Sequence, residues 1–268
     1  MTAAPPIVLT VAGSDPSGGA GLQADLKAIH QHGAYGAAVP TLITVQDSLE
    51  VGRVELLPAD LVRAQLSAVL SDLAPAAAKT GALGSPKVAR VLGSIMTETQ
   101  FDWVVDPVWL PSRGTPLSRG DMVAAYKDAV IPHADLITPN ADEAGLLAEM
   151  PVRTLDDAYK AAERIASLGA AAVLIKGGHL EGADRGTDLL LHDGELSELK
   201  AATIVPGRFH GTGCALSAAI ACRLAFGEDL CAAVGGAKDW LVGALAHAFA
   251  VGKGAKPVNH LWPLEHKP

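Results

Sequence analysis

The sequence predicts an α/β fold in which a mostly parallel central sheet is flanked by helices. Two observations lead to this prediction. Apolar runs of strand length recur along the chain, and most segments between them repeat their apolar residues with a helical period. Strands that are apolar throughout and alternate with helices are typical of parallel sheets covered on both faces. No linker, composition break or internal repeat divides the 268 residues, so we expect one domain over residues 1–268.

The expected strands are the apolar runs, taken in chain order. They lie at residues 7–12, 40–45, 76–79, 103–108, 136–138, 172–176 and 189–192. Apolar residues with helical spacing predict one helix over 61–73 and another over 155–165. Small residues from Ala215 to Arg223 predict a third, buried helix. A long C-terminal helix is expected to carry Trp240, Leu241, Leu245 and Phe249, in the core or at an interface.

Charge and cysteine content restrict the classes of function. The formal net charge is −8, so the chain has no basic surplus with which to neutralise a nucleic acid. Its three cysteines, Cys214, Cys222 and Cys231, form no C-x-x-C pair and leave an odd one over. This pattern fits neither a disulfide framework nor a zinc site, and it favours the reducing cytoplasm.

From the sequence of the two terminal regions, we expect neither an export signal nor a membrane span. No basic residue precedes the first apolar run, which makes it a poor signal peptide. The apolar C-terminal region is interrupted by Lys238, Asp239 and His247, so we expect no membrane span there. The expected partners are therefore small molecules, with neither nucleic acid nor a membrane, and we expect a homodimer.

Polar residues follow six of the expected strands. Ligands of open α/β sheets bind outside the carboxyl ends of the strands, so these clusters predict one assembled site. The clusters are Gly13-Ser14-Asp15, Gln46-Asp47-Ser48, Thr80-Gly81, Asp106, Asn140 and Lys176-Gly177-Gly178-His179.

The hexapeptide from Phe209 to Cys214 predicts an anion-binding turn. Its glycines, Gly211 and Gly213, precede a helix whose first N–H groups and dipole attract negative charge. The same field favours a thiolate at Cys214, which could accept the proton of an alcohol during phosphoryl transfer. A glycine turn with a structural cysteine is an equal alternative for this segment alone. Cys222 and Cys231 are expected to be ordinary buried residues.

Two further segments have open interpretations. The run Gly13–Gly21 contains four glycines that let a ligand approach the backbone, although it matches no Walker A pattern and could be a plain turn. Asn140 followed by Glu143 is typical of a helix capping box. The alternative places Glu143 with Asp106 in an acidic Mg²⁺ and phosphate environment.

Two charged residues stand at the ends of apolar strands. Asp106 lies in an apolar run beside Pro107, where a carboxylate needs a partner or a metal, so we favour a functional role. Lys176 ends another apolar run, and it either contacts phosphate or marks the exposed end of the strand. His179 and His210 are interpreted as ordinary polar residues rather than as the base.

Taken together, the motifs resemble those of the hydroxymethylpyrimidine/phosphomethylpyrimidine kinases of thiamin biosynthesis, within the ribokinase-like superfamily. The resemblance extends from about Val8 to Trp262. It rests on seven motifs in order: Ala12-Gly13-Ser14-Asp15 with Gly18-Gly19-Ala20-Gly21-x-Gln23-Ala24-Asp25, Thr44-x-Gln46, Lys79-Thr80-Gly81, Val104–Val108, Thr138-Pro139-Asn140-x-x-Glu143, Lys176–His179 and His210–Cys214.

The resemblance implies a three-layer ribokinase-like sandwich that uses ATP and Mg²⁺. It implies phosphorylation of 4-amino-5-hydroxymethyl-2-methylpyrimidine and then of its monophosphate to the diphosphate. The implied pyrimidine site comprises Gly13, Ala20, Asp25, Gln46 and Val108. The Gln46 amide suits an aminopyrimidine because it can donate and accept. The implied nucleotide-binding residues are Asp106, Asn140, Glu143, Lys176 and Thr212, and Asp106 and Glu143 would hold Mg²⁺ directly or through water. The implied catalytic residues are Gly211 and Gly213 of the anion hole, Lys176, and Cys214 as the base.

Several positions depart from the family pattern. Family members often have Met at Ala82 and Trp109, Asn at Asp47 and Thr at Phe209, and their flap carries a lysine where this chain has Pro111-Ser112-Arg113-Gly114-Thr115. Two interpretations of this loop stay open: it closes over the phosphates, with Arg113 restoring the charge, or it is an ordinary exposed loop. Pyridoxal or pyridoxine kinase activity remains the alternative, as does a non-catalytic pyrimidine- or nucleotide-binding role.

Overall fold

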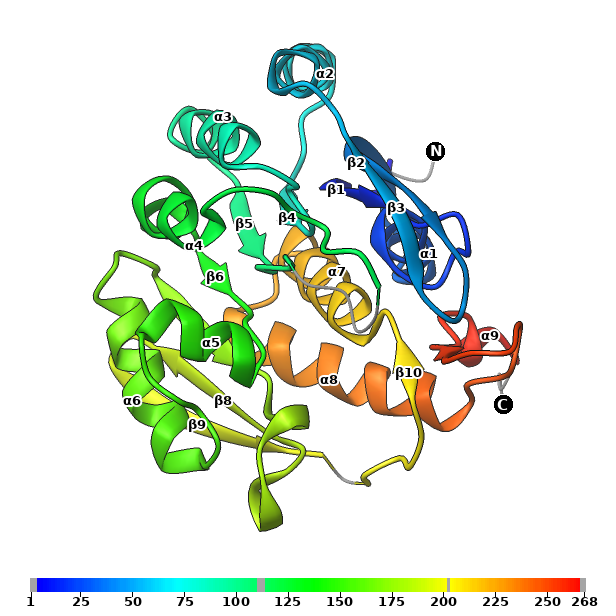
Figure 1. Cartoon of the computed structure of the whole chain (residues 1–268), viewed down its shortest axis with the longest axis vertical. Coiled ribbons are helices and arrows are strands. Elements are labelled where there is room, and N and C mark those ends of the chain that lie inside the picture. The colour runs from blue at the N-terminus through cyan, green and yellow to red at the C-terminus, as the bar shows by residue number, and fades with distance from the viewer. Residues whose placement is uncertain (1–3, 110–113, 202, 266–268) are drawn as a thin grey trace.

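A computed structural model describes residues 4–109, 114–201 and 203–265. In this part of the chain, six adjacent strands of one sheet (β2, β1, β4, β5, β6 and β7) run parallel (Figure 1). Strand β3 pairs antiparallel at one end of the sheet, and β8 and β9 pair antiparallel at the other. The predicted mostly parallel sheet is confirmed. The spatial order is β3 (Val51–Leu56), β2 (Tyr35–Gln46), β1 (Ile7–Ser14), β4 (Ala77–Thr80), β5 (Asp102–Val105), β6 (Leu136–Ile137), β7 (Ala172–Ile175), β8 (Thr187–His192) and β9 (Glu195–Lys200).

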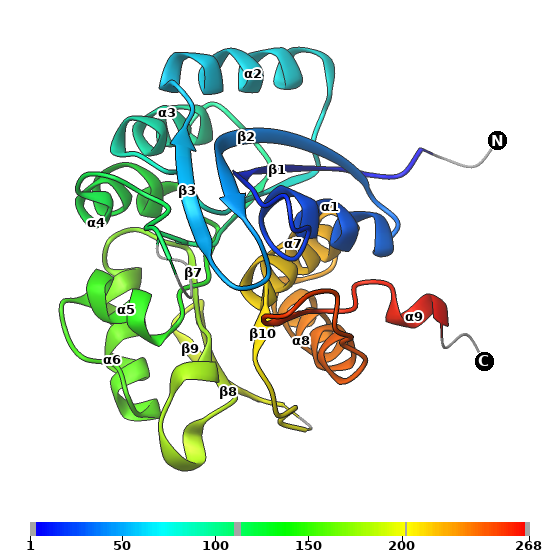
Figure 2. The ribbon, with the colours of Figure 1, turned by 45° about the vertical axis from the view of Figure 1, so that its right-hand side comes forward.

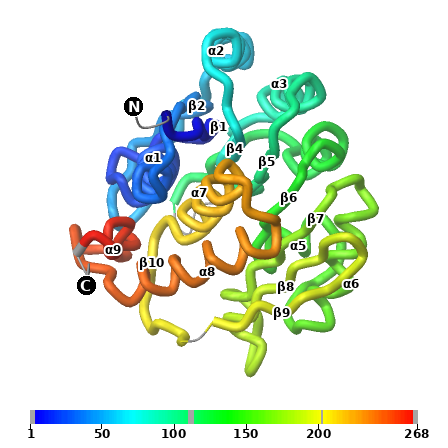
Figure 3. Tube along the Cα trace, turned by 180° about the vertical axis from the view of Figure 1, so that it is seen from behind, coloured from blue at the N-terminus to red at the C-terminus, as the bar shows by residue number. Residues whose placement is uncertain are grey.

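Helices cover the two faces of the sheet and give three layers (Figures 1 and 3). One face carries α1 (Gly21–Gln31), α7 (Thr212–Ala225) and α8 (Leu230–Ala246). The other carries α2 (Ala59–Asp72), α3 (Pro86–Met96), α4 (Met122–Ala125), α5 (Ala141–Ala148) and α6 (Leu155–Ala166). A π-helical turn at Tyr126–Val130 and a 3₁₀ turn at Ile131–His133 continue α4.

The side chains of the central strands explain this layering. Trp103 and Val105 of β5 pack into the core beneath α2–α6, whereas Val104 between them packs toward α1, α7 and α8. Successive strand residues point to opposite faces, so an uninterrupted apolar strand requires cover on both sides. The small residues of α7, with Ala218 and Ala221 fully buried, let that helix approach the middle of the sheet, where it contacts β1, β4 and β5.

The C-terminal segment contacts the residues that lead into α7 and the loop that follows β2. Strand β11 (Lys256–Pro257) pairs with β10 (Phe209–His210), which leads directly into α7 (Figure 2). The backbone N–H of Ala255 donates to the carbonyl of Ser48, just after β2. The last described element is the short helix α9 (Trp262–Glu265). Nowhere in residues 4–109, 114–201 or 203–265 is a helix long and apolar enough to cross a membrane.

Some local expectations differ from the structure. Strand β9 is almost wholly exposed and therefore lacks the apolar run that marked the other strands. Strand β5 ends at Val105, before Pro107, which cannot donate to a ladder. Helix α8 ends at Ala246, so Phe249 lies beyond it and is exposed. The expectation that Cys231 is buried is wrong, since it is exposed in the first turn of α8.

Candidate active site

The polar residues that follow the parallel strands gather at one edge of the sheet, beside the N-terminus of α7. Three charged side chains form the centre of this group. The ammonium of Lys176, after β7, lies 2.7 Å from Oδ1 of Asp106, after β5, and 3.9 Å from Oε2 of Glu143 in α5. Asp106 is fully buried, and burial of a carboxylate is tolerated here because the lysine compensates its charge.

Glycine at position 213 lets the backbone of the turn approach this ion pair closely. A Cβ on Gly213 would lie 3.1 Å from Nζ of Lys176 and 3.2 Å from Oδ2 of Asp106. That second carboxylate oxygen of Asp106 is buried and has no hydrogen-bond partner in the described residues. The backbone of the predicted anion turn is therefore held against a charged pair with one acceptor still unused.

Glu143 forms the capping box that the sequence predicts and also lies in the charged cluster, while its role toward Mg²⁺ and phosphate stays a prediction. Its Oε2 accepts from the N–H of Asn140 at 2.8 Å, and Oδ1 of Asn140 accepts from the N–H of Glu143 at 2.9 Å, which makes a complete capping box for α5. The same carboxylate faces Lys176 and Asp106. Burial raises the pKa of Glu143 to about 7, opposed by Lys176 and reinforced by Asp106. Asn140 thus acts in this structure as the cap, while Glu143 belongs to the charged cluster.

The anion turn itself has the backbone geometry that the sequence predicts. Gly211 is the N-cap of α7 with φ of +79°, a conformation that other residues rarely adopt, and a Cβ there would meet the carbonyl oxygen of Gly19 at 1.9 Å. Helix α7 begins at Thr212, so the N–H groups of its first turn have no partners within the helix. This first turn lies at the edge of the sheet that holds Lys176 and Asp106, since Gly213 is next to both side chains.

Cys214 occupies the first turn of α7, but its environment does not favour a thiolate. Burial raises the pKa of the Cys214 thiol to about 11, because it outweighs the nearby Lys79, and Asp25 and Asp106 add to the rise. The expectation that the helix field would stabilise the thiolate is therefore wrong for the protein without ligands. The thiol is protonated at neutral pH and becomes a base only as its proton is lost.

Asp25 and Lys79 form a fully buried ion pair beside Cys214. Nζ of Lys79 lies 2.9 Å from Oδ1 of Asp25, and the hydroxyl of Thr10 donates to Oδ2 at 2.6 Å. Both carboxylate oxygens of Asp25 are thus bound by Thr10 and Lys79 in the interior of the protein, and neither is exposed to a substrate. Lys79 was not predicted to take part in the site, although a lysine in an apolar strand indicates that a charged partner lies nearby.

The other residues assigned to the pyrimidine site lie at the ends of β1, β2 and β5. Gly13 packs against Leu42 so closely that a Cβ would lie 2.6 Å from Cδ1 of that leucine. Ala20 donates its N–H to Asp15, and Gln46 is half-buried at the end of β2. Val108 packs on a small apolar cluster that includes Leu42, Val51, Val54 and Ala82. Amide and apolar surfaces therefore meet on this side of the site.

The loop after β5 can be described only in part. Pro111, Ser112 and Arg113 lie outside the described residues, so closure of this loop and the role of Arg113 stay predictions. The N–H of Thr115 donates to the carbonyl of Val51 at 2.8 Å, which ties the end of the loop to β3. Trp109, one of the departures from the family pattern, is buried and packs edge-on against Tyr126 with ring centroids 5.3 Å apart.

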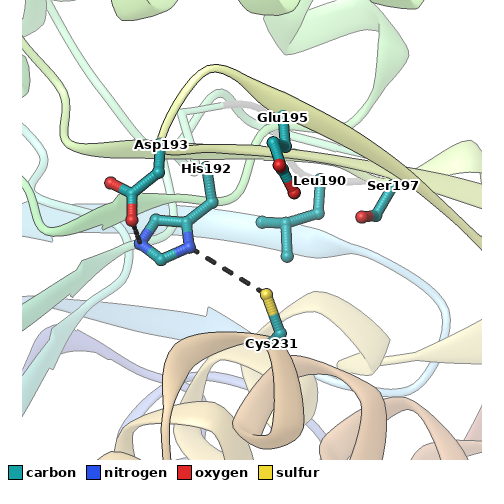
Figure 4. Close-up of a pocket in the computed structure, with 6 residues that line it drawn as sticks. All are labelled: Leu190, His192, Asp193, Glu195, Ser197 and Cys231. Atoms are coloured by element: carbon teal, nitrogen blue, oxygen red, sulfur yellow. Dashed lines mark hydrogen bonds and ion pairs between the residues drawn. The ribbon is translucent and has the colours of Figure 1, made fainter.

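A separate cavity of about 280 Å³ lies between the β8–β9 hairpin and the start of α8 (Figure 4). Cys231 faces His192 across it, with Sγ 3.9 Å from Nδ1. None of its lining residues belongs to the charged cluster or the anion turn. Among the described residues, no three His, Cys, Asp or Glu side chains are placed to hold a metal ion by themselves.

Comparison with known proteins identifies the family. The model of a family described as phosphomethylpyrimidine kinase matches residues 15–259, most of the chain. The chain belongs to this family. A hydroxymethylpyrimidine/phosphomethylpyrimidine kinase of Synechococcus elongatus is 41% identical, and the alignment covers 97% of this chain and 98% of that protein.

Solved structures of the phosphomethylpyrimidine kinase family and of pyridoxal kinases share the fold. The ADP complex of Bacillus subtilis pyridoxal kinase superimposes with a TM-score of 0.89 at 32% identity, over 98% of this chain and 100% of that one. A phosphomethylpyrimidine kinase of Clostridium difficile gives a TM-score of 0.78 at 34% identity, over 90% of this chain and 99% of that one. The expected ribokinase-like architecture is thus confirmed.

Proposed function

We propose that this protein transfers the γ-phosphoryl group of ATP to the hydroxymethyl group of 4-amino-5-hydroxymethyl-2-methylpyrimidine, and then a second phosphoryl group to the monophosphate. The name of the Synechococcus relative, which covers nearly the whole chain, supports this substrate and reaction. The ADP bound to the Bacillus subtilis pyridoxal kinase supports the nucleotide. Phosphoryl transfer requires hydrogen-bond donors, a cation and a base. At one edge of the sheet, the N–H groups at the start of α7, Lys176 and Cys214 would supply these.

The observation that carries the proposal is the close approach of the Gly213 backbone to both Lys176 and Asp106. The N-terminus of α7 supplies backbone N–H donors at the same place. A phosphoryl group seated there would interact with the lysine and with backbone N–H groups through its equatorial oxygens. Those interactions strengthen as negative charge spreads over the oxygens in the transition state.

The reaction makes and breaks one bond to phosphorus. The hydroxymethyl oxygen forms a bond to the γ-phosphorus, the bond from that phosphorus to the β,γ-bridging oxygen breaks, and ADP leaves with the electron pair. We assign the hydroxyl proton to the sulfur of Cys214 in its thiolate form, so the thiol first releases its own proton to water and then takes up the proton of the substrate hydroxyl. Gln46 would bind the aminopyrimidine edge, with Gly13, Ala20 and Val108 around the ring. Asp25 would not touch the substrate, and its role would be to hold Lys79 beside Cys214.

The residues present also fit Mg²⁺ as a partner of the nucleotide. Asp106 has an unused, buried carboxylate oxygen, and Glu143 is the second carboxylate of the cluster. Mg²⁺ usually takes only one or two carboxylates and completes its shell with water and substrate phosphates, so a larger protein cage is unnecessary. When bound, the ion would neutralise phosphate charge, with Asp106 and Glu143 holding it directly or through water.

A steady-state comparison of three acceptors tests the proposal. We expect ADP formation with the hydroxymethylpyrimidine and with its monophosphate, and lower specificity constants with pyridoxal. Gln46→Ala should lower kcat/KM for the pyrimidine by about 5- to 100-fold, because it leaves a polar edge of the substrate unpaired. Unchanged kcat/KM in Gln46→Ala would contradict the assigned pocket.

Pyridoxal kinase activity is the second candidate. It is favoured by the TM-score of 0.89 to the Bacillus subtilis pyridoxal kinase, which exceeds the value for the Clostridium difficile phosphomethylpyrimidine kinase. A higher kcat/KM for pyridoxal than for the pyrimidine would establish it. A non-catalytic binding protein would consume no ATP when either acceptor is added.

A further inference from the structure

Three side chains from distant parts of the sequence meet at the pyrimidine side of the site. Asp15 follows β1, Gln46 ends β2, and His210 lies in β10 just before the anion turn. Nε2 of His210 lies 2.9 Å from Oδ2 of Asp15 and 3.1 Å from Nε2 of Gln46. The reaction described above uses neither Asp15 nor His210.

Asp15 determines where the histidine carries its hydrogen. Its carboxylate also accepts from the N–H groups of Ser17 and Ala20, each at 2.9 Å. Burial raises the pKa of Asp15, but the hydrogen bonds from His210 and Ser17 outweigh it and hold the pKa below its ordinary value. An ionised carboxylate only accepts hydrogen bonds, so Nε2 of His210 must be the donor.

That donor fixes one end of the Gln46 amide. A ring nitrogen that carries a hydrogen cannot accept a hydrogen bond from an amide nitrogen. The oxygen and nitrogen of an amide have nearly the same outline, so their partners decide which way the group faces. With the amide oxygen toward His210, the contact becomes a hydrogen bond, and the histidine hydrogen is shared between Asp15 and Gln46.

The contact of Thr44 with the other polar atom of the Gln46 amide indicates the same orientation of that amide. The Thr44 hydroxyl lies 2.9 Å from the carbonyl oxygen of Ser14 and 3.1 Å from the Gln46 amide atom assigned as Oε1, and it can donate its hydrogen to either one. The Ser14 carbonyl is the nearer acceptor. A hydroxyl has a single hydrogen, and once it is given to Ser14 only lone pairs face Gln46. The amide NH₂ group must therefore point toward Thr44 and its oxygen toward His210.

We propose that His210 is a positioning residue which, held by Asp15, sets the orientation of the Gln46 amide and thereby selects substrates with an amino group beside a ring nitrogen. This inference rests on the proposed binding of the pyrimidine by Gln46. The oriented amide retains one N–H and one oxygen lone pair. An aminopyrimidine edge offers the matching pair, an amino donor next to a nitrogen acceptor, whereas the pyridoxal ring has no such edge.

The surroundings of the histidine keep its ring in place. A Cβ on Gly19 would lie 2.6 Å from Cδ2 of His210, so the glycine-rich loop packs directly on the ring. The backbone of His210 pairs with Pro257 of β11. The ring is thus held by the loop on one side and its backbone by the C-terminal segment, which is what a fixed donor requires.

The decisive experiment compares two acceptors that differ only in the amino group. These are 4-amino-5-hydroxymethyl-2-methylpyrimidine and 5-hydroxymethyl-2-methylpyrimidine, and the readout is the ratio of their kcat/KM values. The wild type should favour the amino compound, and His210→Leu should reduce that preference by about 5- to 100-fold. His210→Gln, whose amide can again place an N–H toward Gln46, should restore most of it. His133→Leu, at an exposed histidine remote from the site, is the matched control and should leave the ratio unchanged.

A double-mutant cycle shows whether His210 acts through Gln46. In a Gln46→Ala background, His210→Leu should have no further effect on the ratio, since the amide that it orients is gone. Equal losses with both acceptors in His210→Leu would overturn the proposal and leave the histidine a purely structural role. Thr44→Val should reduce the ratio in the same direction, and it serves as the test if His210→Leu does not fold.

A measurement without turnover separates this inference from the proposed reaction. The side-chain NH₂ of Gln46 gives a pair of ¹H–¹⁵N signals, identified by their loss in Gln46→Ala. These signals should move in His210→Leu and Thr44→Val but not in His133→Leu. Failure of the wild type to phosphorylate either pyrimidine would overturn the proposed function alone, whereas unmoved signals would overturn the orientation of Gln46 by His210 whatever the substrate.

Discussion

The ammonium of Lys176 lies 2.7 Å from Oδ1 of Asp106, although 70 positions separate the two residues in the sequence. Strands β5 and β7 bring them together at the same edge of the sheet. Asp106 is fully buried, so the lysine compensates a charge that would otherwise be costly. The pair therefore holds a cation in place before any phosphate arrives.

Replacement of Lys176 should separate its catalytic role from a structural one. Lys176→Ala is expected to lower kcat by 10²-fold or more, because the phosphoryl oxygens lose their nearest cation, while pyrimidine affinity stays nearly unchanged. Isothermal titration with the pyrimidine and steady-state kinetics measure the two effects. Lys127→Ala is the matched control, since Lys127 pairs with the exposed Glu149 away from the site. An equal loss of pyrimidine affinity in Lys176→Ala would indicate a structural lysine.

Glu143 should make stability depend on pH. Its folded-state pKa of about 7 lies above the ordinary value of 4.5, so between these values the folded protein holds a proton that the unfolded chain releases. Stability is therefore lost as the pH rises from 4.5 through 7, by up to about 3 kcal/mol. Urea unfolding at pH 5 and pH 8 should show that Glu143→Gln gains stability relative to the wild type at the higher pH. A pH-independent difference between the two proteins would contradict the raised pKa.

The sequence could predict these charged positions but not their partners. Apolar strands that alternate with helices indicate a parallel sheet, and that topology places Asp106 and Lys176 at one edge. The spacing of Asn140 and Glu143 equally predicts the capping box. Which carboxylate Lys176 contacts depends on how β5 and β7 are each aligned against β6 between them, and Glu143 belongs to both the cap and the cluster. Pairings of this kind arise from packing between distant segments rather than from local spacing.

Burial was the property that the sequence predicted least well. Asp25 looked available to a substrate, and only the structure shows both of its oxygens engaged by Lys79 and Thr10. Cys231 looked like part of a buried helix, yet it lies in an exposed first turn. The exposed strand β9 lacks an apolar run. In each case the decisive factor is which neighbouring element covers the residue, and one segment of sequence does not contain that information.

The buried pair of Asp25 and Lys79 should show strong energetic coupling. Lys79→Met removes one charge and leaves the other uncompensated, so it is expected to lower the free energy of unfolding by about 3–5 kcal/mol. Lys79→Met combined with Asp25→Asn removes both charges and should cost less than the sum of the two single changes. Urea denaturation of the four proteins measures this. Additive losses would mean that the two side chains do not act as an ion pair.

The three cysteines should differ in reactivity. Cys231 is exposed, whereas Cys222 is fully buried and burial raises its pKa to about 12. At pH 8 a thiol reagent such as iodoacetamide should modify Cys231 first and Cys222 only on unfolding. Cys214, with a pKa of about 11, should react slowly in the native protein. Peptide mass spectrometry identifies the modified residue, and rapid native labelling of Cys222 would contradict its placement in the core.

Cys214 should matter for the first phosphorylation and much less for the second. In the first step the acceptor is an alcohol, whose proton must be removed as its oxygen attacks. In the second step the acceptor is a phosphate monoester, whose second pKa of about 6 leaves its oxygens ionised at neutral pH without help from a base. Cys214→Ala should therefore slow the first step by roughly 10²- to 10⁴-fold and the second step only slightly.

The pH dependence of the first step gives an independent check on this role. Because the Cys214 thiol has a pKa of about 11, the fraction of thiolate in the free protein rises with pH, and kcat/KM for the pyrimidine alcohol should rise between pH 7 and 9.5. Cys214→Asp supplies a carboxylate that is already ionised across this range, so its profile should be flatter and part of the lost rate should return. If Cys214→Ala instead slows both phosphorylations equally, the sulfur accepts no proton, and the residue at the start of α7 serves only to shape the anion turn.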